Sequence, residues 1–215
     1  GTVIAITQTD ASGAFLFTNA PVGNYRLVQL HPAGYGFSTP LQIDVSIPPA
    51  GLSNQLFGKT LSSIAGEVFL DLDHNGVRGP QDTAIPGSVI ELLNAVGTVV
   101  ATTTSDGNGA WRFDDLPAAG YTLRQPAQPA GTLQGLTSVG SAGGSSSLAS
   151  AAVSATSGIA LVVDTDATGY RFAEIPPARI AGSIYLDLDN NGLREAGETG
   201  SAGQTVTLVG TNDLG

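Results

Sequence analysis

The stretch IAGEVFLDLDHNGVRGPQDTAIPG at Ile64–Gly87 recurs as IAGSIYLDLDNNGLREAGETGSAG at Ile180–Gly203. Each copy begins with a short run rich in β-branched and aromatic residues, which is typical of a strand. An acidic loop with a glycine in its middle follows each run. Because a strand and its loop recur together, the chain is built from repeated structural units.

Both copies place oxygen-bearing side chains at the spacing of an EF-hand calcium loop. Counted from the first aspartate, acceptors stand at positions 1, 3 and 5, glycine at position 6 and a carboxylate at position 12. Position 7 contributes a backbone carbonyl in such loops. The predicted Ca²⁺ ligands are Asp71, Asp73, Asn75, Val77 and Asp82 in the first loop, and Asp187, Asp189, Asn191, Leu193, Glu195 and Glu198 in the second.

An acidic surface turn is the alternative interpretation, because Asp and Asn are common in turns for backbone reasons. Two copies that both keep the acid at position 12 favour calcium. The runs before the loops, GEVFL and GSIYL, are too short for the flanking helix of an EF-hand, so the sequence predicts calcium loops on a β scaffold. The second loop carries four acids against three, so we expect it to bind Ca²⁺ more tightly.

Composition indicates an all-β protein and excludes several kinds of function. The 215 residues include 29 glycines and 12 prolines among many Val, Ile and Thr runs, and none reads as a long amphipathic helix. A net charge of −10 argues against nucleic acid and anionic membranes as partners, and no apolar run approaches the roughly 20 residues of a membrane span. Without cysteine, disulfides and zinc-thiolate sites are excluded.

A second repeat relates Gly1–Gln29 to Gly97–Gln125, which align without gaps. Each copy predicts a meander of strand, glycine turn, strand, Pro/Gly turn and strand. Asp10, Asp106 and Asn108 lie in the glycine turns, where we favour a turn role over a metal-ligand role. The strands predicted here are Thr2–Gln8, Thr98–Thr104, the runs around Phe15 and Phe17 and around Trp111 and Phe113, Tyr25–Val28 and Tyr121–Arg124.

The repeats predict three blocks: a C-terminal part of a β-sandwich at residues 1–61, a complete sandwich at 62–178 and an N-terminal part of the next sandwich at 179–215. Joining Gly215 to Gly1 reads as a continuous hairpin and meander. We therefore expect one cyclically cut unit of a longer array, either a covalent tandem chain or subunits that complete each other's sheets by strand addition.

Between Pro126 and Asp164 the chain carries no charged side chain. Within this segment, the low-complexity run SVGSAGGSSSLASAAVSATSG at residues 138–158 predicts a long surface loop, with a lateral contact as the alternative. The other predicted strands are Leu41–Ile47, Asn54–Phe57, Ser88–Leu93, Ile159–Val163, Tyr170–Ala173 and Gln204–Val209.

The order GEVFLDLDHNGVR, IPGSVIELL and GTVVATTTSDGNGAWRFDDLPAAGYTLRQ resembles the SdrD B-like repeats of bacterial surface adhesins, relatives of the Cna B-type domains. The resemblance implies tandem prealbumin-like or immunoglobulin-like β-sandwiches with EF-hand-like calcium loops, in an extracellular or surface-anchored bacterial protein. It places the metal ligands on the acidic and amide side chains at positions 1, 3, 5 and 12 of the two loops. Asp82 departs from the usual glutamate, being one methylene shorter.

We therefore expect a structural, non-catalytic module of a stalk, adhesin, fibre or sheath that self-associates with identical units, with a host or matrix surface ligand as a further partner to test. Catalysis is disfavoured because Asp71 and Asp73 lie on one turn, whereas glycosidase acids face each other across a cleft. The alternative function is a carbohydrate- or peptide-binding module. A solvent-exposed Trp111 beside Tyr121 would favour that alternative.

Overall fold

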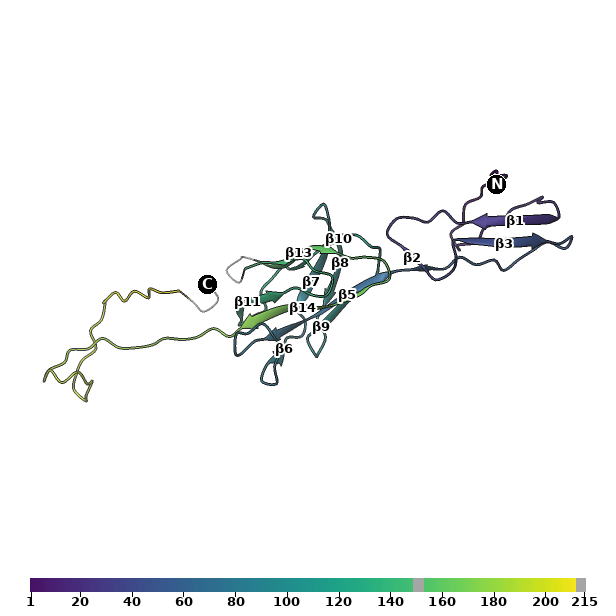
Figure 1. The fold of residues 1–215 in the computed structure, drawn as a ribbon. Helices are drawn as coiled ribbons and strands as arrows, with labels where there is room; N and C mark the ends of the chain where they lie inside the picture. Colours follow the sequence, from purple (N-terminus) through teal and green to yellow (C-terminus); the bar gives the residue numbers. More distant parts are fainter. Residues whose placement is uncertain (149–152, 212–215) are drawn as a thin grey trace.

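The computed structural model describes residues 1–148 and 153–211, and its fourteen elements are all strands. The all-β prediction is therefore confirmed. We name residues 1–61 the first block, 62–178 the middle block and 179–211 the third block. Figure 1 shows the middle block between the other two. No helix in the described part of the chain is long and apolar enough to cross a membrane.

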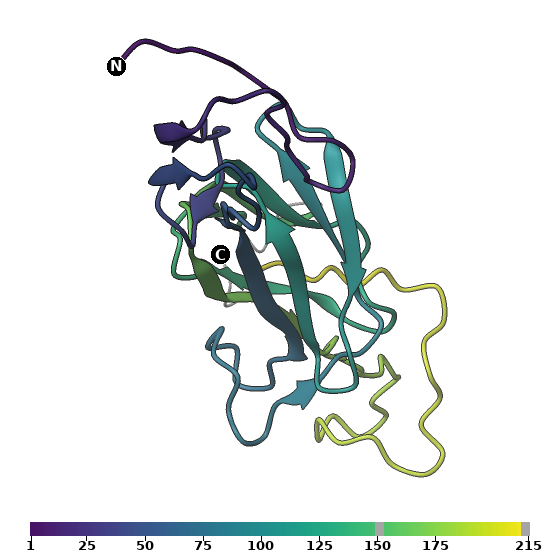
Figure 2. The ribbon, with the colours of Figure 1, turned by 90° about the vertical axis from the view of Figure 1, so that its right-hand side faces the viewer.

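The middle block contains two sheets, which Figure 2 shows from a second side. One has the strand order β12-β13-β10-β7-β8; the other has the order β11-β14-β5-β6, with β9 also paired to β5. Their strands are β5 (Ser62–Leu70), β6 (Thr83–Ala84), β7 (Val89–Asn94), β8 (Val99–Thr104), β9 (Ala110–Leu116), β10 (Gly120–Gln125), β11 (Leu133–Ser138), β12 (Ser145–Ser146), β13 (Ser154–Ala160) and β14 (Asp166–Ile175).

The core lies between these sheets and follows from the alternation of each strand. Ile90 and Leu92 on β7 and Leu123 on β10 are fully buried, whereas the residues between them are less buried or exposed. Burying such a side chain stabilises the fold by about 1.5–3 kcal/mol. The middle block is thus a β-sandwich with one contiguous apolar core.

Strand β5 is the centre of its sheet, paired antiparallel with β9 and parallel with β14. Gly66 on β5 lies opposite Trp111 of β9, and a Cβ at Gly66 would overlap both the Trp111 ring and the carbonyl oxygen of Tyr170. The missing side chain lets the Trp111 ring reach Phe172 on β14, with ring centroids 6.1 Å apart. Glycine is therefore required where the indole crosses β5.

The first block contains an antiparallel pair, β1 (Gly23–Val28) with β3 (Gln42–Ile47), and a short pair, β2 (Gly36–Phe37) with β4 (Lys59–Thr60). The predicted strands at Tyr25–Val28 and Leu41–Ile47 are confirmed. Three predicted strands are absent from this block: Thr2–Gln8, the run around Phe15 and Phe17, and Asn54–Phe57. Among the described residues these segments have no neighbouring strand to pair with, and a strand is defined by such pairing.

The third block shows one bridge, between Tyr185 and Gly200, and no extended strand within its described residues. The prediction of a strand at Gln204–Val209 is wrong for the same reason, because no described residue pairs with this segment. Gly215, which the sequence predicts to join Gly1, lies outside the described residues.

The low-complexity run is not one long loop, and that prediction is wrong in part. Its residues form the end of β11, all of β12 and most of β13. Ser154 and Thr156 are buried on β13, which pairs with β10. Small neutral side chains fit a strand that hydrogen bonds to a neighbour, so low complexity is a poor indicator of a loop here.

Candidate metal centres

The first acidic loop starts where β5 ends. Asp71 is fully buried, and its backbone N–H donates to the carbonyl oxygen of Glu174 at 2.7 Å. The Asp71 carboxylate accepts from the backbone N–H of Asn75 at 3.2 Å and of Gly76 at 2.7 Å. The loop therefore curls around its first aspartate.

Further contacts hold the other predicted ligands around this aspartate. The Asn75 amide donates to Asp73 Oδ2 at 2.7 Å, and Asn75 Oδ1 accepts from the N–H of Val77 at 2.6 Å. The carboxylate at position 12, Asp82, returns across the loop and accepts from the N–H groups of positions 2 and 9 at 2.9 and 2.6 Å.

The donor set fits Ca²⁺. One carboxylate oxygen from each of Asp71, Asp73 and Asp82 lies within 4.8 Å of the other two. Two oxygens that bind one Ca²⁺ at about 2.3–2.6 Å can be at most about 5 Å apart. The three carboxylates thus converge tightly enough for a single ion, and exclusively oxygen donors suit a hard dication.

The second loop has the same architecture. Oxygens of Asp187, Asp189 and Glu198 also lie within 4.8 Å of one another. Asp187 accepts from the N–H groups of Asn191 at 3.2 Å and Gly192 at 2.8 Å. These hydrogen bonds lower the pKa of Asp187, that of Gly192 most, because they stabilise the ionised carboxylate.

The two position-12 acids make equivalent contacts in spite of their different lengths. Glu198 accepts from the N–H of Leu188 at 2.9 Å and of Glu195 at 3.1 Å, the counterparts of the Leu72 and Gly79 donors to Asp82. The missing methylene of Asp82 therefore does not prevent the loop from closing.

The predicted ligand Glu195 lies outside the carboxylate cluster of the second loop. The Glu195 carboxylate accepts from the Asn191 amide at 2.6 Å, and Asp187, Asp189 and Glu198 form the group of converging acids. Leu193 donates its N–H to Asn191 Oδ1 at 2.7 Å, as Val77 does in the first loop.

The backbones of the loops share two left-handed positions. Position 6 is glycine in both, with φ of 72° at Gly76 and 78° at Gly192. Position 4 is also left-handed, with φ of 59° at His74 and 61° at Asn190. The second feature was missed from the sequence, although Asn is the non-glycine residue that adopts this conformation most readily.

The loops differ in how they contact the rest of the chain. A Cβ at Gly76 would lie 3.2 Å from Leu136 on β11, and Ser138 of β11 donates to the Gly76 carbonyl at 3.3 Å. Gly192 has nothing within 4 Å of the equivalent point. The first loop is thus supported by a strand of the sandwich, and this support is absent around Gly192.

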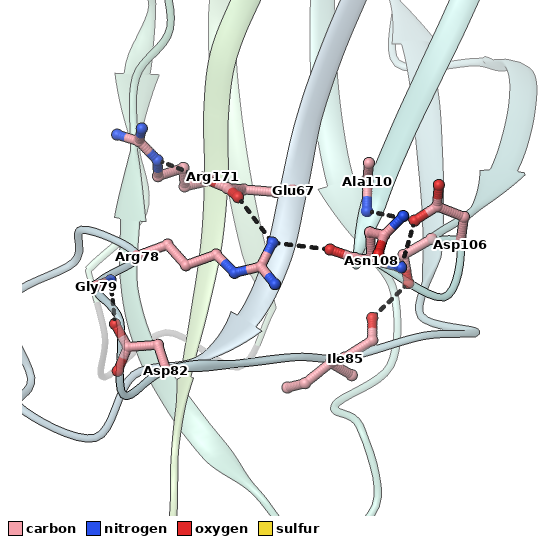
Figure 3. Close-up of polar contacts among 10 residues, drawn as sticks. Glu67, Arg78, Gly79, Asp82, Ile85, Asp106, Asn108, Ala110 and Arg171 are labelled. Atoms are coloured by element: carbon pink, nitrogen blue, oxygen red, sulfur yellow. Dashed lines mark hydrogen bonds and ion pairs between the residues drawn. The ribbon is translucent and has the colours of Figure 1, made fainter.

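Arg78 gives the first loop a second support (Figure 3). It donates to the carbonyl oxygen of Asn108 at 2.8 Å and to Glu67 on β5 at 3.4 Å. Glu67 also accepts from Arg171 on β14 at 2.7 Å. The role of Arg78 was missed from the sequence, because its contact with Asn108 joins it to a turn 30 residues further along the chain.

The aspartates of the glycine turns accept hydrogen bonds from backbone N–H groups of their own turns. Asp106 accepts from the N–H groups of Asn108 at 2.8 Å and Ala110 at 2.9 Å (Figure 3), and Asp10 accepts equivalently from Ser12 and Ala14 at 2.9 and 3.0 Å. These contacts are those of a turn, which was the favoured interpretation.

The comparison with family models decides the family of the chain. The model of the SdrD B-like domain matches residues 62–174, more than half of the sequence. This chain belongs to the SdrD B-like domain family. The predicted bacterial extracellular or cell-surface location is confirmed with it.

Relatives of this SdrD B-like chain are longer proteins. It is 26% identical over 238 residues to serine-aspartate repeat-containing protein D of Staphylococcus aureus (strain Newman), covering 99% of the chain and 17% of that relative. It is 31% identical over 154 residues to serine-aspartate repeat-containing protein E of Staphylococcus aureus (strain Mu50 / ATCC 700699), covering 64% and 13%. The chain thus spans less than a fifth of these curated relatives.

Solved structures resemble the SdrD B-like chain only loosely. The Bacillus anthracis TIE protein aligns with 78% of this chain and 28% of its own, at 16% identity and a TM-score of 0.42. The shaft pilin of Lactobacillus rhamnosus GG aligns with 83% and 70%, at 12% identity and a TM-score of 0.38.

The SdrD B-like sandwich buries the aromatic pair that would have favoured a binding module. Trp111 is 3% exposed and Tyr121 is 7% exposed. Both belong to the core, and the Tyr121 hydroxyl donates to the carbonyl oxygen of Pro117 at 2.9 Å. This pair therefore offers no exposed platform for a sugar ring.

Proposed function

We propose that this chain is a non-catalytic structural repeat of a bacterial surface stalk, adhesin or fibre, that Ca²⁺ stiffens it, and that it associates with identical units. One observation carries the proposal: two loops in different blocks build the same three-carboxylate cluster with the same hydrogen bonds. A repeated cation site in a family of surface domains suits a recurring mechanical role.

The position of the first loop supports stiffening. Asp71 is bonded to Glu174 near the end of β14, and Pro176 and Pro177 follow directly on the way to the third block. An ion held by Asp71, Asp73 and Asp82 would fix the loop to the point where the chain leaves the sandwich. Local fraying of β14 would then require the ion to be released, so a bound ion would make this fraying less favourable.

The loop acids also argue against catalysis. The three clustered carboxylates of the first loop all belong to the same loop. Asp71 and Asp82 accept hydrogen bonds from backbone N–H groups of that loop. A catalytic pair needs groups that converge on a substrate from different elements. These acids are arranged around a point inside the loop.

Calorimetric titration of the full chain with CaCl₂ tests the proposal, together with melting curves in Ca²⁺ and in chelator. We expect two binding events and a higher melting temperature in Ca²⁺. Mass action adds about 2.7 kcal/mol of stability at a hundredfold excess over Kd. No heat of binding, or a melting temperature indifferent to chelator, would refute calcium stiffening.

A further inference from the structure

Strand structure runs almost without a break from the first block into the middle block. Strand β4 ends at Thr60 and β5 begins at Ser62, so one residue, Leu61, separates them. Strand β4 pairs with β2 of the first block, and β5 pairs with β9 and β14 of the sandwich. Figure 1 shows β2 where the two blocks meet. The connection is therefore held by strand pairing on both sides of Leu61.

Hydrogen bonds fix this connection to the loop between β13 and β14. The Thr60 hydroxyl donates to Asp164 Oδ1. The Ser62 hydroxyl donates to the carbonyl oxygen of Val162 at 2.8 Å and accepts from the N–H of Thr165 at 3.1 Å. Ser62 is 4% exposed, so rotation at the connection would leave buried polar groups without partners.

A second contact lies away from the connecting strand, in residues 32–36, which we name the docking loop. The carbonyl oxygen of Gly34 accepts from the N–H of Ala118 at 2.5 Å, in the turn between β9 and β10. Gly34 has a left-handed φ of 86°. A Cβ there would lie 3.0 Å from the Ala118 carbonyl oxygen and 3.1 Å from Pro117. The backbone of the docking loop thus lies directly against this turn.

The docking loop makes another close approach at Gly36, the first residue of β2. Gly36 is buried and pairs with Thr60. A Cβ at Gly36 would overlap both the Asp164 carboxylate and the Thr60 hydroxyl. Asp164 itself has a left-handed φ of 56°, which Asp adopts more readily than most residues. One side chain of the sandwich therefore contacts both strands of the β2–β4 pair.

Tyr35 lies between the two glycines, and its side chain interacts with both blocks. Lys59 Nζ of β4 lies 5.3 Å from the centroid of the Tyr35 ring, within the range of a cation–π interaction. Burial raises the pKa of Tyr121 in the sandwich, and the nearby Tyr35 hydroxyl raises it further. The docking loop thus brings an aromatic residue to the end of the sandwich as well as its backbone.

The first block is attached to the sandwich through two separate segments. One is the connecting strand, with the bond from Thr60 to Asp164, and the other is the docking loop, with the bond from Ala118 to Gly34. Relative motion is the ordinary expectation for domains that share only a linker and a small interface. Attachments on two segments oppose rotation about the connection, because turning about one would break the other.

This junction lies far from the first candidate metal centre. Strand β5 begins at Ser62 beside the junction, and Asp71 follows the last residue of β5. Nine residues of strand span about 30 Å. No predicted Ca²⁺ ligand takes part in the junction contacts described above. An ion in the first loop would therefore not touch the junction.

We propose that the end of the sandwich formed by Pro117, Ala118 and Asp164 is a docking surface for the first block, and that the two blocks form one rigid body with or without Ca²⁺. The partner of this surface is the docking loop with the β2–β4 pair of the same chain. The inference goes beyond the proposed function, because it rests neither on Ca²⁺ binding nor on self-association.

Distances between spin labels test this rigidity. The chain contains no cysteine, so Ser46→Cys on β3 and Thr102→Cys on β8, both at exposed positions, each accept one nitroxide. Pulsed electron paramagnetic resonance on the full chain gives the distribution of distances between the labels. We expect one narrow distribution that is the same in Ca²⁺ and in chelator. A broad distribution in either condition would overturn the proposal.

Gly34→Ala combined with Thr60→Val tests the docking contacts in the labelled chain. The methyl group crowds the turn, and valine removes the hydroxyl that donates to Asp164. We expect a distance distribution several-fold broader than in the parent chain. Fluorescence of Trp111, the only tryptophan, should show that the sandwich stays folded. A distribution as narrow as that of the parent would overturn the proposal.

Gly131→Ala combined with Thr18→Val is the matched control. Gly131 has a φ of 81°, so alanine there meets the same backbone strain as at Gly34, but nothing lies within 4 Å of its Cβ. Thr18 is exposed in the first block. We expect the narrow distribution of the parent, and broadening equal to that of the docking variant would overturn the assignment of these contacts.

The same samples separate this inference from calcium stiffening. A distribution that is narrow in Ca²⁺ and broad in chelator would overturn the inference and leave calcium stiffening standing. Narrow distributions in both conditions, in a chain that takes up no Ca²⁺ in calorimetry, would support the inference and refute calcium stiffening.

Discussion

The backbone N–H of Asp71 donates to the carbonyl oxygen of Glu174 at 2.7 Å, so the first residue of the acidic loop is bonded to the end of β14. Both residues are fully buried. The candidate cation site and the last strand of the sandwich therefore share a hydrogen bond inside the protein. A substitution in the acidic loop should therefore alter the stability of β14, and a substitution at the end of β14 should alter the loop.

Asp71→Asn should remove the Ca²⁺-dependent rise in the melting temperature of the middle block. It replaces a ligand charge with an amide whose NH₂ group can face the Asn75 and Gly76 donors. An unsatisfied buried donor costs about 1–3 kcal/mol, so the variant should also melt lower in chelator. Asp44→Asn, an exposed aspartate paired with Arg26, is the control and should keep the full calcium response. A calcium response retained by Asp71→Asn would contradict the prediction.

Glu195→Gln should weaken Ca²⁺ binding by the second loop without abolishing it. Glu195 bonds to Asn191 and lies outside the three converging carboxylates, so it acts on the ion through space. A charge at that range contributes about 1 kcal/mol, or roughly fivefold in Kd. Calorimetry on this variant should show the first loop unchanged. Complete loss of the second binding event would instead make Glu195 a direct ligand.

Glu174→Gln should remove a pH dependence of stability. Burial raises the pKa of the Glu174 carboxyl from 4.5 to about 7, against the opposing effect of hydrogen bonds from Gln128 and Gln125. Between pH 4.5 and 7 the unfolded chain has lost this proton while the folded chain keeps it. The free energy of unfolding therefore falls as pH rises through this window, by about 3 kcal/mol in total.

Urea unfolding at pH 5, 6, 7 and 8, in chelator, measures this effect. The wild-type chain should lose stability across the series, and Glu174→Gln should lose much less. Glu91→Gln keeps Glu174 and serves as the control that retains the fall. Parallel curves for wild type and Glu174→Gln would show that Glu174 does not carry the dependence.

Gly66→Ala should destabilise the middle block by about 3 kcal/mol or more, because the added methyl group overlaps a backbone carbonyl and the Trp111 ring. The Tyr170 carbonyl is held in the β5 and β14 pairing and cannot move aside cheaply. Gly107→Ala, in a turn with open space around it, is the matched control. Chemical denaturation should give a lower free energy of unfolding for Gly66→Ala than for Gly107→Ala. Equal free energies for the two variants would refute the crossing of Trp111 over β5.

The sequence predicted the all-β class and the loop geometry, because glycine and acid spacing act locally. Asp71, Asp73 and Asp82 converge as their spacing in the chain indicates. Strand pairing is not local, and this explains the errors. Thr2–Gln8 has the same pattern as Thr98–Thr104, yet only the second segment finds neighbours and contains strand β8. Arg78 was missed because its bond to Asn108 depends on a distant turn.

The parallel pairing of β5 with β14 has a consequence for a chain under tension. The chain enters the sandwich at the start of β5, beside Asp166, and leaves it past Glu174, which is paired with Leu70 at the other end of β5. A pull applied through the neighbouring blocks would draw these two adjacent strands in opposite directions along their length. The hydrogen bonds between them would then be loaded together in shear rather than opened one after another, so the sandwich should resist extension best along the axis on which the blocks are strung.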